Sequence, residues 1–206
     1  MRLIKFISLF TFIAVYFFSV TACANQPSNE TVQNFTLPDY NGNQHSLSDY
    51  VDSEAIVIVF VATECPVSND YNSRMETIYS EYSEKGVAFI GINSNKAESV
   101  ERIKEHAEEN GLTFTILKDK NNVVADEMDA SVTPEVYVVN SEFEILYHGR
   151  IDNSRDEDDV NSNDLENALN EILDGKPVSK SSTKAFGCTI KRVQWFLFFR
   201  NGNSIV

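Results

Sequence analysis

Residues 55–68 read AIVIVFVATECPVS, which joins an apolar strand pattern to a single cysteine followed by proline. It opens with a continuous apolar run rich in β-branched residues, which is typical of a strand buried on both faces. Cys65 follows after a polar pair, and residues 69–75 read as the start of a helix. A cysteine between a strand and a helix N-terminus lies at the positive end of the helix dipole, which lowers its pKa and favours the nucleophilic thiolate. The sequence therefore predicts a reactive sulfur at Cys65.

Strand and helix patterns alternate along the rest of the chain. Gly86 and Gly111 are expected to end two of the helices. We expect strands at 32–38, 55–62, 87–93 and 114–117, a hairpin of 135–139 with 144–148, and helices at 69–85, 94–110, 122–130 and about 165–173. Alternating strands and helices predict a parallel sheet covered on both faces, to which the late hairpin adds antiparallel strands. The predicted fold class is α/β, with a central mixed sheet flanked by helices.

Composition limits the classes of partner. The chain has 206 residues and a formal net charge of -14, and no stretch of it is strongly basic. Nucleic-acid binding needs clustered Lys and Arg, so nucleic acid is not an expected partner. The acidity is that of a well-solvated surface. The length fits one domain plus a targeting segment.

The N-terminus has the pattern of an export signal. Arg2 and Lys5 precede an apolar run over 6–20, which is short for a membrane span. Residues 20–23, VTAC, resemble a bacterial lipobox, in which the cysteine becomes the lipidated first residue of the mature protein. We therefore expect a signal at 1–23, a lipid on Cys23, and a polar tether at 24–34. Soluble export after cleavage at an A-x-A site and a retained anchor are the alternatives, and all three place the domain outside the cytoplasm.

The cysteine count is small. Cys23, Cys65 and Cys188 are the three cysteines of the chain. A lipid on Cys23 would leave two thiols, the number that one redox pair needs. Disulfides persist outside the cytoplasm.

A second motif lies far from Cys65 in the sequence. Thr133 and Pro134 directly precede a predicted strand, where a proline can adopt the cis form. A cysteine that opens a helix after the first central strand, together with this turn before a hairpin, resembles the thioredoxin fold. In that family the cis-proline loop lies against the reactive cysteine and offers backbone groups to a bound thiol substrate.

The resemblance is closer to the redoxin branch, the alkyl hydroperoxide reductase C and thiol-specific antioxidant family. It rests on the pieces PD at 38–39, TECP at 63–66, GINS at 91–94 and GRID at 149–152, and it covers about 35–175. It implies a thioredoxin-like domain at 35–175, a tail at 176–206, and a thiol-based oxidoreductase that needs no cofactor or metal. The implied partners are a disulfide or hydroperoxide substrate and an external thiol reductant, with the membrane reached through the N-terminal lipid. Because Ala24 is not the aspartate of inner-membrane retention, the resemblance favours a periplasm-facing lipoprotein of the outer membrane.

Two departures from the family patterns limit the activity that can be carried over. A local dithiol needs C-x-x-C, but the fourth position is Ser68. A peroxiredoxin site has a threonine or serine three residues before the cysteine and a proline further upstream, where this chain has Ala62 and Ile58. Thr63 stands one residue too late, and such a shift normally turns a side chain away.

The resemblance still assigns roles to particular residues. Cys65 is the expected nucleophile, with Thr63 and Pro134 beside it, and Cys188 on the basic tail is the expected resolving thiol. The alternative for Cys188 is a buried or spare thiol. Pro66, Thr133 and Arg150 are candidates for substrate binding, although a surface ion pair is the ordinary role of such an arginine.

Other polar residues carry weaker signals. Glu64 could transfer a proton beside Cys65, but a solvent-exposed carboxylate is the simpler expectation. His45, His106 and His148 are scattered, and we expect non-catalytic roles for them, with His106 in an exposed helical run. The aromatic residues at 195–199 are too few to span a bilayer.

The sequence is also compatible with two other functions. One is a copper-delivery module on the same fold, which has the motif C-x-x-x-C and a later histidine. This chain has a single cysteine at that motif, whereas a soft metal ion is bound by more than one soft ligand. A non-catalytic envelope scaffold would keep the fold and lose the chemistry. An ordinary thiol pKa at Cys65, near ~8.5, would indicate the scaffold.

Overall fold

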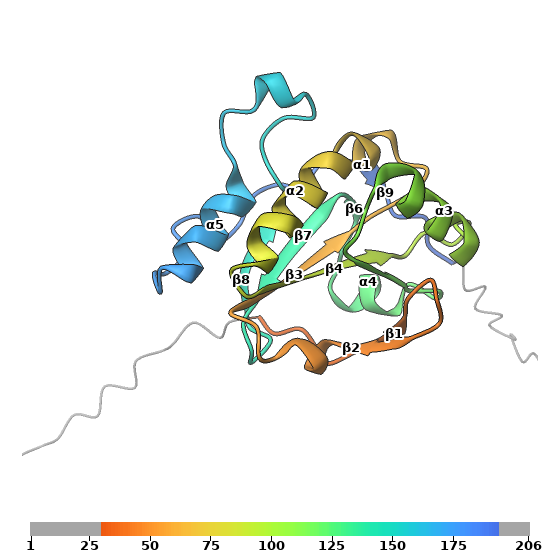
Figure 1. The fold of residues 1–206 in the computed structure, drawn as a ribbon, viewed down its shortest axis with the longest axis horizontal. Helices are drawn as coiled ribbons and strands as arrows, with labels where there is room; N and C mark the ends of the chain where they lie inside the picture. The colour runs from red at the N-terminus through yellow and green to blue at the C-terminus, as the bar shows by residue number, and fades with distance from the viewer. Residues whose placement is uncertain (1–29, 194–206) are drawn as a thin grey trace, which may run out of the picture.

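The computed structural model describes residues 30–193 of the chain. Their main sheet has five strands in the spatial order β5-β4-β3-β7-β8 (Figure 1). Parallel pairing joins β3 to β4 and β4 to β5, and antiparallel pairing joins β7 to β3 and β8. The bounds are β3 (Ala55–Phe60), β4 (Val87–Asn93), β5 (Thr115–Lys118), β7 (Glu135–Val139) and β8 (Ile145–Gly149). The predicted mixed sheet is confirmed.

The central strand β3 explains the two-layered core. Its side chains alternate between the faces of the sheet. Val57 and Val59 belong to one buried cluster, and Ile56 and Ile58 to the other. All residues of β3 are fully buried, so a continuous apolar run is what this position requires.

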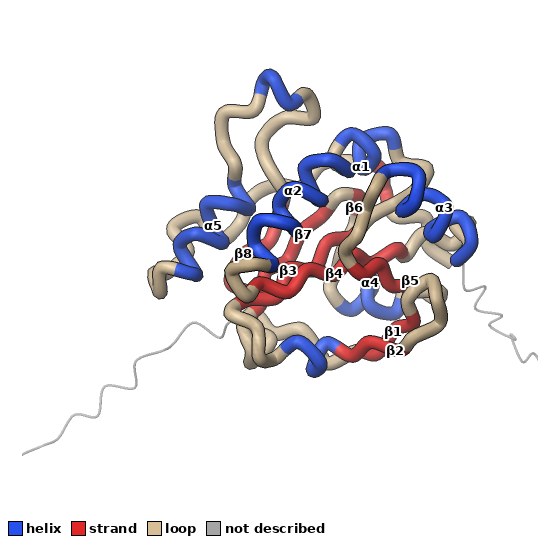
Figure 2. The backbone as a smooth tube through the Cα atoms, viewed as in Figure 1, coloured by secondary structure: helices blue, strands red, loops and turns tan. Residues whose placement is uncertain are grey.

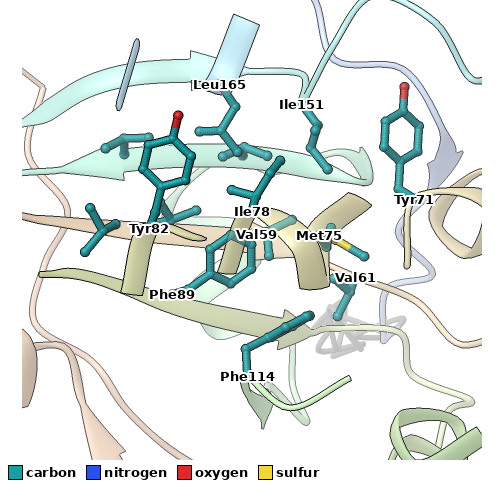
Figure 3. Packing of buried hydrophobic residues seen from close by; sticks show 14 of the residues in the cluster. Val59, Val61, Tyr71, Met75, Ile78, Tyr82, Phe89, Phe114, Ile151 and Leu165 are labelled. Carbon is teal, nitrogen blue, oxygen red and sulfur yellow. The ribbon is translucent and has the colours of Figure 1, made fainter. Parts of the chain in front are cut away.

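Helices cover both faces of the sheet, as Figure 1 shows. The face of Val59 carries α2 (Asn72–Ser83), α3 (Val100–Asn110) and α5 (Asp164–Leu173). Figure 3 shows Met75 and Ile78 of α2 beside Val59 in this cluster. The opposite face carries α4 (Val123–Glu127), the short helix η1 (Leu47–Tyr50), and the hairpin of β1 (Thr36–Pro38) with β2 (Gln44–Ser46).

Two helices begin at positions other than those the sequence indicated. The helix expected at 69–85 starts earlier, as α1 (Pro66–Asp70), and Tyr71 separates it from α2. The helix expected at 94–110 starts later, because the side chain of Ser99 accepts the N-terminal hydrogen bond from Arg102 N. Ser94, where the helix was expected to begin, donates to Asp119 within a polar loop at the end of β4.

The sequence patterns did not predict a further pair of short strands. β6 (Val132–Thr133) pairs antiparallel with β9 (Cys188–Thr189), which brings the C-terminal segment back to the cis-proline loop near α1 (Figure 1). The loop between β8 and α5, which contains η2 (Glu157–Asp159), projects from the body of the molecule (Figure 2). Among the helices of residues 30–193, none has the length and apolar character needed to cross a bilayer.

Candidate functional site

Cys65 caps the first helix after the central strand. It is the N-cap residue of α1, and its Sγ accepts a hydrogen bond from the backbone N–H of Ser68 at 3.3 Å. The carbonyl oxygen of Thr133 lies 3.3 Å from the same sulfur. Cys65 is only 4% exposed. The sulfur therefore lies at the start of the helix, as the sequence predicts. The sequence does not indicate that Cys65 is buried.

The structure joins Cys65 to Cys188 in a disulfide. Their Cα atoms are 5.8 Å apart although the residues are separated by 123 positions in sequence. The strand pairing of β6 with β9 places Thr133 opposite Cys188, which sets the tail cysteine against the loop that already contacts Cys65. Cys188 thus takes the place of the second cysteine that the C-x-x-C pattern lacks.

The cis-proline loop is the meeting point of the two cysteines. The Thr133–Pro134 peptide bond is cis, as the sequence indicated that it could be. Gly187 crosses this loop so closely that a Cβ atom there would lie 2.0 Å from the carbonyl oxygen of Thr133. Its φ of 159° also lies in a region that residues with a side chain rarely adopt. Only glycine fits at this crossing.

Further contacts hold the tail beyond Cys188. Ile190 is 3% exposed, and its backbone N–H donates to Ser131 O at 2.9 Å. Lys191 N donates to Asn95 Oδ1 at 2.7 Å, and Lys96 N donates to Lys191 O at 2.9 Å. The segment from Gly187 to Lys191 is therefore docked by backbone hydrogen bonds and an apolar anchor in addition to the disulfide.

The buried carboxylate of Glu98 holds the residues that directly precede Cys65 in the chain. Oε2 of Glu98 accepts hydrogen bonds from Thr63 N at 2.7 Å and from Asn93 Nδ2 at 2.5 Å, and its Oε1 lies 3.4 Å from Glu64 N. Glu98 is 5% exposed. Buried carboxylates need such donors, so Glu98 fixes the path of the chain between β3 and Cys65. The sequence does not distinguish Glu98 from the other acidic residues of a chain that has 31 of them.

The same polar loop contacts both halves of the disulfide region. Residues 93–98 reach the nucleophile loop through Glu98 and the tail through Asn95 and Lys96. Lys118 is buried beneath them and donates to Asn93 Oδ1 and Asn95 O, and burial lowers its pKa. One loop therefore positions Cys65 and Cys188 together.

The hydroxyls of Ser68 and Thr63 make no hydrogen bond to the Cys65 sulfur within residues 30–193. Oγ of Ser68 accepts from Ala62 N at 3.2 Å, so Ser68 contributes only its backbone N–H to Cys65. Oγ1 of Thr63 is buried and has no hydrogen-bond partner within residues 30–193. Thr63 lines a small internal cavity together with Asn72 and His106.

Arg150 does not contact the cysteines in the described part of the chain. Its Nε donates to Asp164 Oδ2 at 2.7 Å, so Arg150 forms an ion pair as expected, but with a buried carboxylate that is 2% exposed rather than at the surface. Asp152, which belongs with Arg150 to the GRID motif at 149–152, accepts hydrogen bonds from the hydroxyl of Tyr71 at 2.7 Å and from Arg74 at 2.5 Å. The motif thus ties the end of β8 to the start of α2. Glu64 is exposed and Pro66 is the first residue of α1.

Glu135 stabilises the cis-proline loop from the other side. It accepts from the backbone N–H groups of Ser131 and Val132 and from His148 Nε2 at 2.7 Å. Burial raises the pKa of Glu135, but these hydrogen bonds outweigh burial and hold its pKa below the usual value. Glu135 is therefore an anionic anchor for the strand that pairs with the tail.

The expectation that His106 is exposed is wrong. His106 is 6% exposed, and its Nε2 lies 3.2 Å from Asn72 Nδ2. Burial and the nearby Arg102 lower its pKa, which favours the neutral imidazole. The charged neighbours on α3 point outward, while His106 shares the inward face with Ile103 and Ala107. Within residues 30–193 no three His, Cys, Asp or Glu side chains converge in a metal-binding arrangement.

Similar solved structures support the fold. A hypothetical protein of Sinorhizobium meliloti is 31% identical with a TM-score of 0.76, covering 80% of this chain and 94% of that one. A conserved protein of Geobacillus kaustophilus is 33% identical with a TM-score of 0.74, covering 79% and 90%. Peroxidoxin BcpB of Mycobacterium tuberculosis, at 20% identity and a TM-score of 0.54 over 71% of this chain and 96% of that one, shares the thioredoxin-like fold.

Sequence relatives with assigned names fall into two groups. The thiol-disulfide oxidoreductase ResA of Halalkalibacterium halodurans is 29% identical over 119 residues, which are 58% of this chain and 66% of that protein. Chloroplastic peroxiredoxin Q of Oryza sativa subsp. japonica is 30% identical over 105 residues, 51% of this chain and 47% of that protein. The chain thus spans slightly less than two thirds of the first relative and about half of the second. The model of the AhpC/TSA family matches residues 29–152, more than half of the chain, and the protein belongs to that family.

Proposed function

We propose that the protein is a two-cysteine thiol oxidoreductase in which Cys65 is the nucleophile and Cys188 the second thiol. The observation that carries the proposal is the disulfide between them, built across the cis-proline loop. Hydrogen bonds dock the tail around Cys188, so the geometry that brings the sulfurs together belongs to the fold.

Reduction of a hydroperoxide would take place in two steps. The Cys65 thiolate attacks the terminal oxygen of a hydroperoxide, the O–O bond breaks, and the oxygen of the leaving alkoxide or hydroxide takes a proton. Cys65 is then a sulfenic acid. The Cys188 thiolate attacks its sulfur, the S–O bond breaks, and the hydroxide leaves as water once protonated. The product is the disulfide, which an external thiol reductant must reopen.

The cover over Cys65 favours a small oxidant. Cys65 is 4% exposed in the disulfide form, and the docking of the tail on the cis-proline loop would keep Thr133 and Cys188 close to its sulfur after reduction, so a hydroperoxide fits the site better than a folded protein disulfide. Pro66 directly follows Cys65 and Thr133 O lies 3.3 Å from its sulfur, so we assign Pro66 and the Thr133–Pro134 loop to substrate binding. Thr63 lines a small internal cavity with Asn72 and His106, so we assign it no contact with the substrate.

Thiol–disulfide exchange is the second candidate reaction. The ResA relatives carry that name, and the observed disulfide is itself a product or reactant of exchange. In this reaction the Cys65 thiolate attacks a substrate disulfide and releases one substrate thiolate, and the Cys188 thiolate then attacks the Cys65 sulfur and releases the other, which leaves Cys65 and Cys188 linked. The two reactions share the same residues and differ in the oxidant.

We also propose that the protein acts outside the cytoplasm. Its N-terminal residues have the pattern of an export signal ending at Cys23, and these residues lie outside the described part of the structure. A persistent disulfide fits an oxidising compartment. Fractionation of cells that express the full chain should place it with the envelope membranes, and Cys23→Ser should release it; recovery of the unchanged chain from the cytoplasm would contradict this location.

Turnover of three variants tests the activity. Full-chain wild type, Cys65→Ser and Cys188→Ser are each given hydrogen peroxide, or oxidised ribonuclease as a protein disulfide, with dithiothreitol as reductant. We expect peroxide consumption by wild type and none by Cys65→Ser, while Cys188→Ser forms a sulfenic acid on Cys65 without an internal disulfide. Cys23→Ser is the matched control and should keep the wild-type rate. Turnover of either substrate by Cys65→Ser would overturn the proposal, and wild-type turnover of the protein disulfide alone would favour exchange.

A further inference from the structure

The two sulfurs of the disulfide differ in exposure. Cys65 is 4% exposed, whereas Cys188 is partly exposed and is followed by the exposed Thr189. The residue at the helix start, which sequence analysis predicts as the reactive one, is therefore the less accessible of the pair. A reductant that approaches the oxidised protein meets Cys188 first.

The surroundings of Cys65 also disfavour attack on its sulfur. Thiol–disulfide exchange proceeds by attack of a thiolate on one sulfur while the other leaves, and access decides which sulfur is attacked. The carbonyl oxygen of Thr133 lies 3.3 Å from the Cys65 sulfur and repels an incoming anion. The N–H of Ser68 donates to that sulfur at 3.3 Å and stabilises it as a leaving thiolate.

The docked tail keeps this arrangement in place. Gly187 on one side of Cys188 crosses closely over Thr133, and Ile190 on the other side is 3% exposed. Backbone hydrogen bonds then continue the docking at Lys191. Exposing Cys65 from the tail side would require β9 to separate from β6 and Ile190 to leave its site.

We propose that the reducing partner, a dithiol, attacks the sulfur of Cys188 rather than that of Cys65. The partner's thiolate forms a new S–S bond to Cys188 as the Cys65–Cys188 bond breaks, and Cys65 leaves as the thiolate. The partner's second thiolate then attacks its own bonded sulfur, becomes part of the partner's disulfide, and releases Cys188 as a thiolate that takes a proton from solvent. This order returns Cys65 directly in its nucleophilic form. The inference rests on the proposed two-cysteine function.

Glutathione tests which sulfur is attacked. The full chain is first oxidised with diamide, and formation of the Cys65–Cys188 link is checked by non-reducing peptide mapping. Excess glutathione is then added, the reaction is quenched with acid after short times, and free thiols are alkylated before mapping. We expect glutathione on Cys188 and free Cys65 at least tenfold more often than the reverse in the earliest samples. Equal adducts, or glutathione mainly on Cys65, would overturn the inference.

A pair of tail variants ties the preference to docking. Ile190→Asp places a charge at a buried anchor, and Thr189→Asp places the same charge at an exposed neighbour. Ile190→Asp should raise the share of adducts on Cys65, and Thr189→Asp should leave it as in wild type; an unchanged share in Ile190→Asp would contradict the role of the tail. No hydroperoxide is used, so these results are independent of peroxide turnover. Failure of diamide to link Cys65 to Cys188 would count against the proposed function itself.

Discussion

At the scale of single residues, Glu98 positions the nucleophile by holding the two residues that precede it. It holds Thr63 N at 2.7 Å and Asn93 Nδ2 at 2.5 Å while 5% exposed. Glu98→Gln keeps the shape but can present an N–H to donors, so we expect the free energy of unfolding to fall by about 1–3 kcal/mol and Cys65 to react more slowly. Urea unfolding of the reduced protein measures the first effect. Glu108→Gln, on the exposed face of α3, is the control, and equal stabilities for the two variants would contradict this role of Glu98.

His106 gives the reduced protein a pH dependence near neutrality. Burial lowers the pKa of His106 below its ordinary value of 6.5, so between the two values the unfolded chain binds more protons than the folded one. Stability is then fully present above the ordinary value and is lost as the pH falls through the lowered one, at a slope of at most about 1.4 kcal/mol per pH unit. Denaturation of wild type and His106→Gln between pH 7.5 and 5 should show a flatter slope in the variant. Parallel slopes would refute the assignment.

At the scale of elements, the docking of β9 on β6 depends on Gly187. A Cβ atom at this position would lie 2.0 Å from Thr133 O, so Gly187→Ala must push the two segments apart. We expect Cys65 and Cys188 to link more slowly after oxidation, as followed by acid quenching and mapping. Gly111→Ala is the matched control, because Gly111 has a φ of 63° but no atom within 4 Å of the added carbon. A normal rate of linking in Gly187→Ala would show that docking does not guide the pairing.

Elements set by local sequence were predictable, and those set by distant pairing were not. The apolar run of β3, the helix after Cys65 and the turn at Pro134 follow from neighbouring residues. β6 and β9 are each two residues long, which is too short for a periodic pattern, and their pairing joins segments far apart in sequence. His106 lies three residues after Ile103 on the inward face, and that spacing could have indicated its burial.

At the scale of the whole molecule, the disulfide closes most of the described chain into one loop. Cys65 and Cys188 are separated by 123 residues, and linking a loop of that size restricts the unfolded chain by about 4–5 kcal/mol in the entropic model. Strain and residual structure reduce such values, so we expect reduction to cost about 2–4 kcal/mol, or roughly 5–15 °C in Tm. Calorimetry with and without a phosphine reductant measures the shift. Cys188→Ser should melt like the reduced protein, and an unchanged Tm would contradict the account.

The central claim is that Cys65 and Cys188 form one redox pair, and peroxide titration of the reduced full chain tests it most directly. One equivalent of hydrogen peroxide is added, the reaction is quenched with acid, and the cysteine peptides are mapped without reduction. We predict that the peptides of Cys65 and Cys188 become linked in proportion to the peroxide added, with Cys23 uninvolved. A Cys65 that stays a free thiol, or that links only to other chains, would contradict the account.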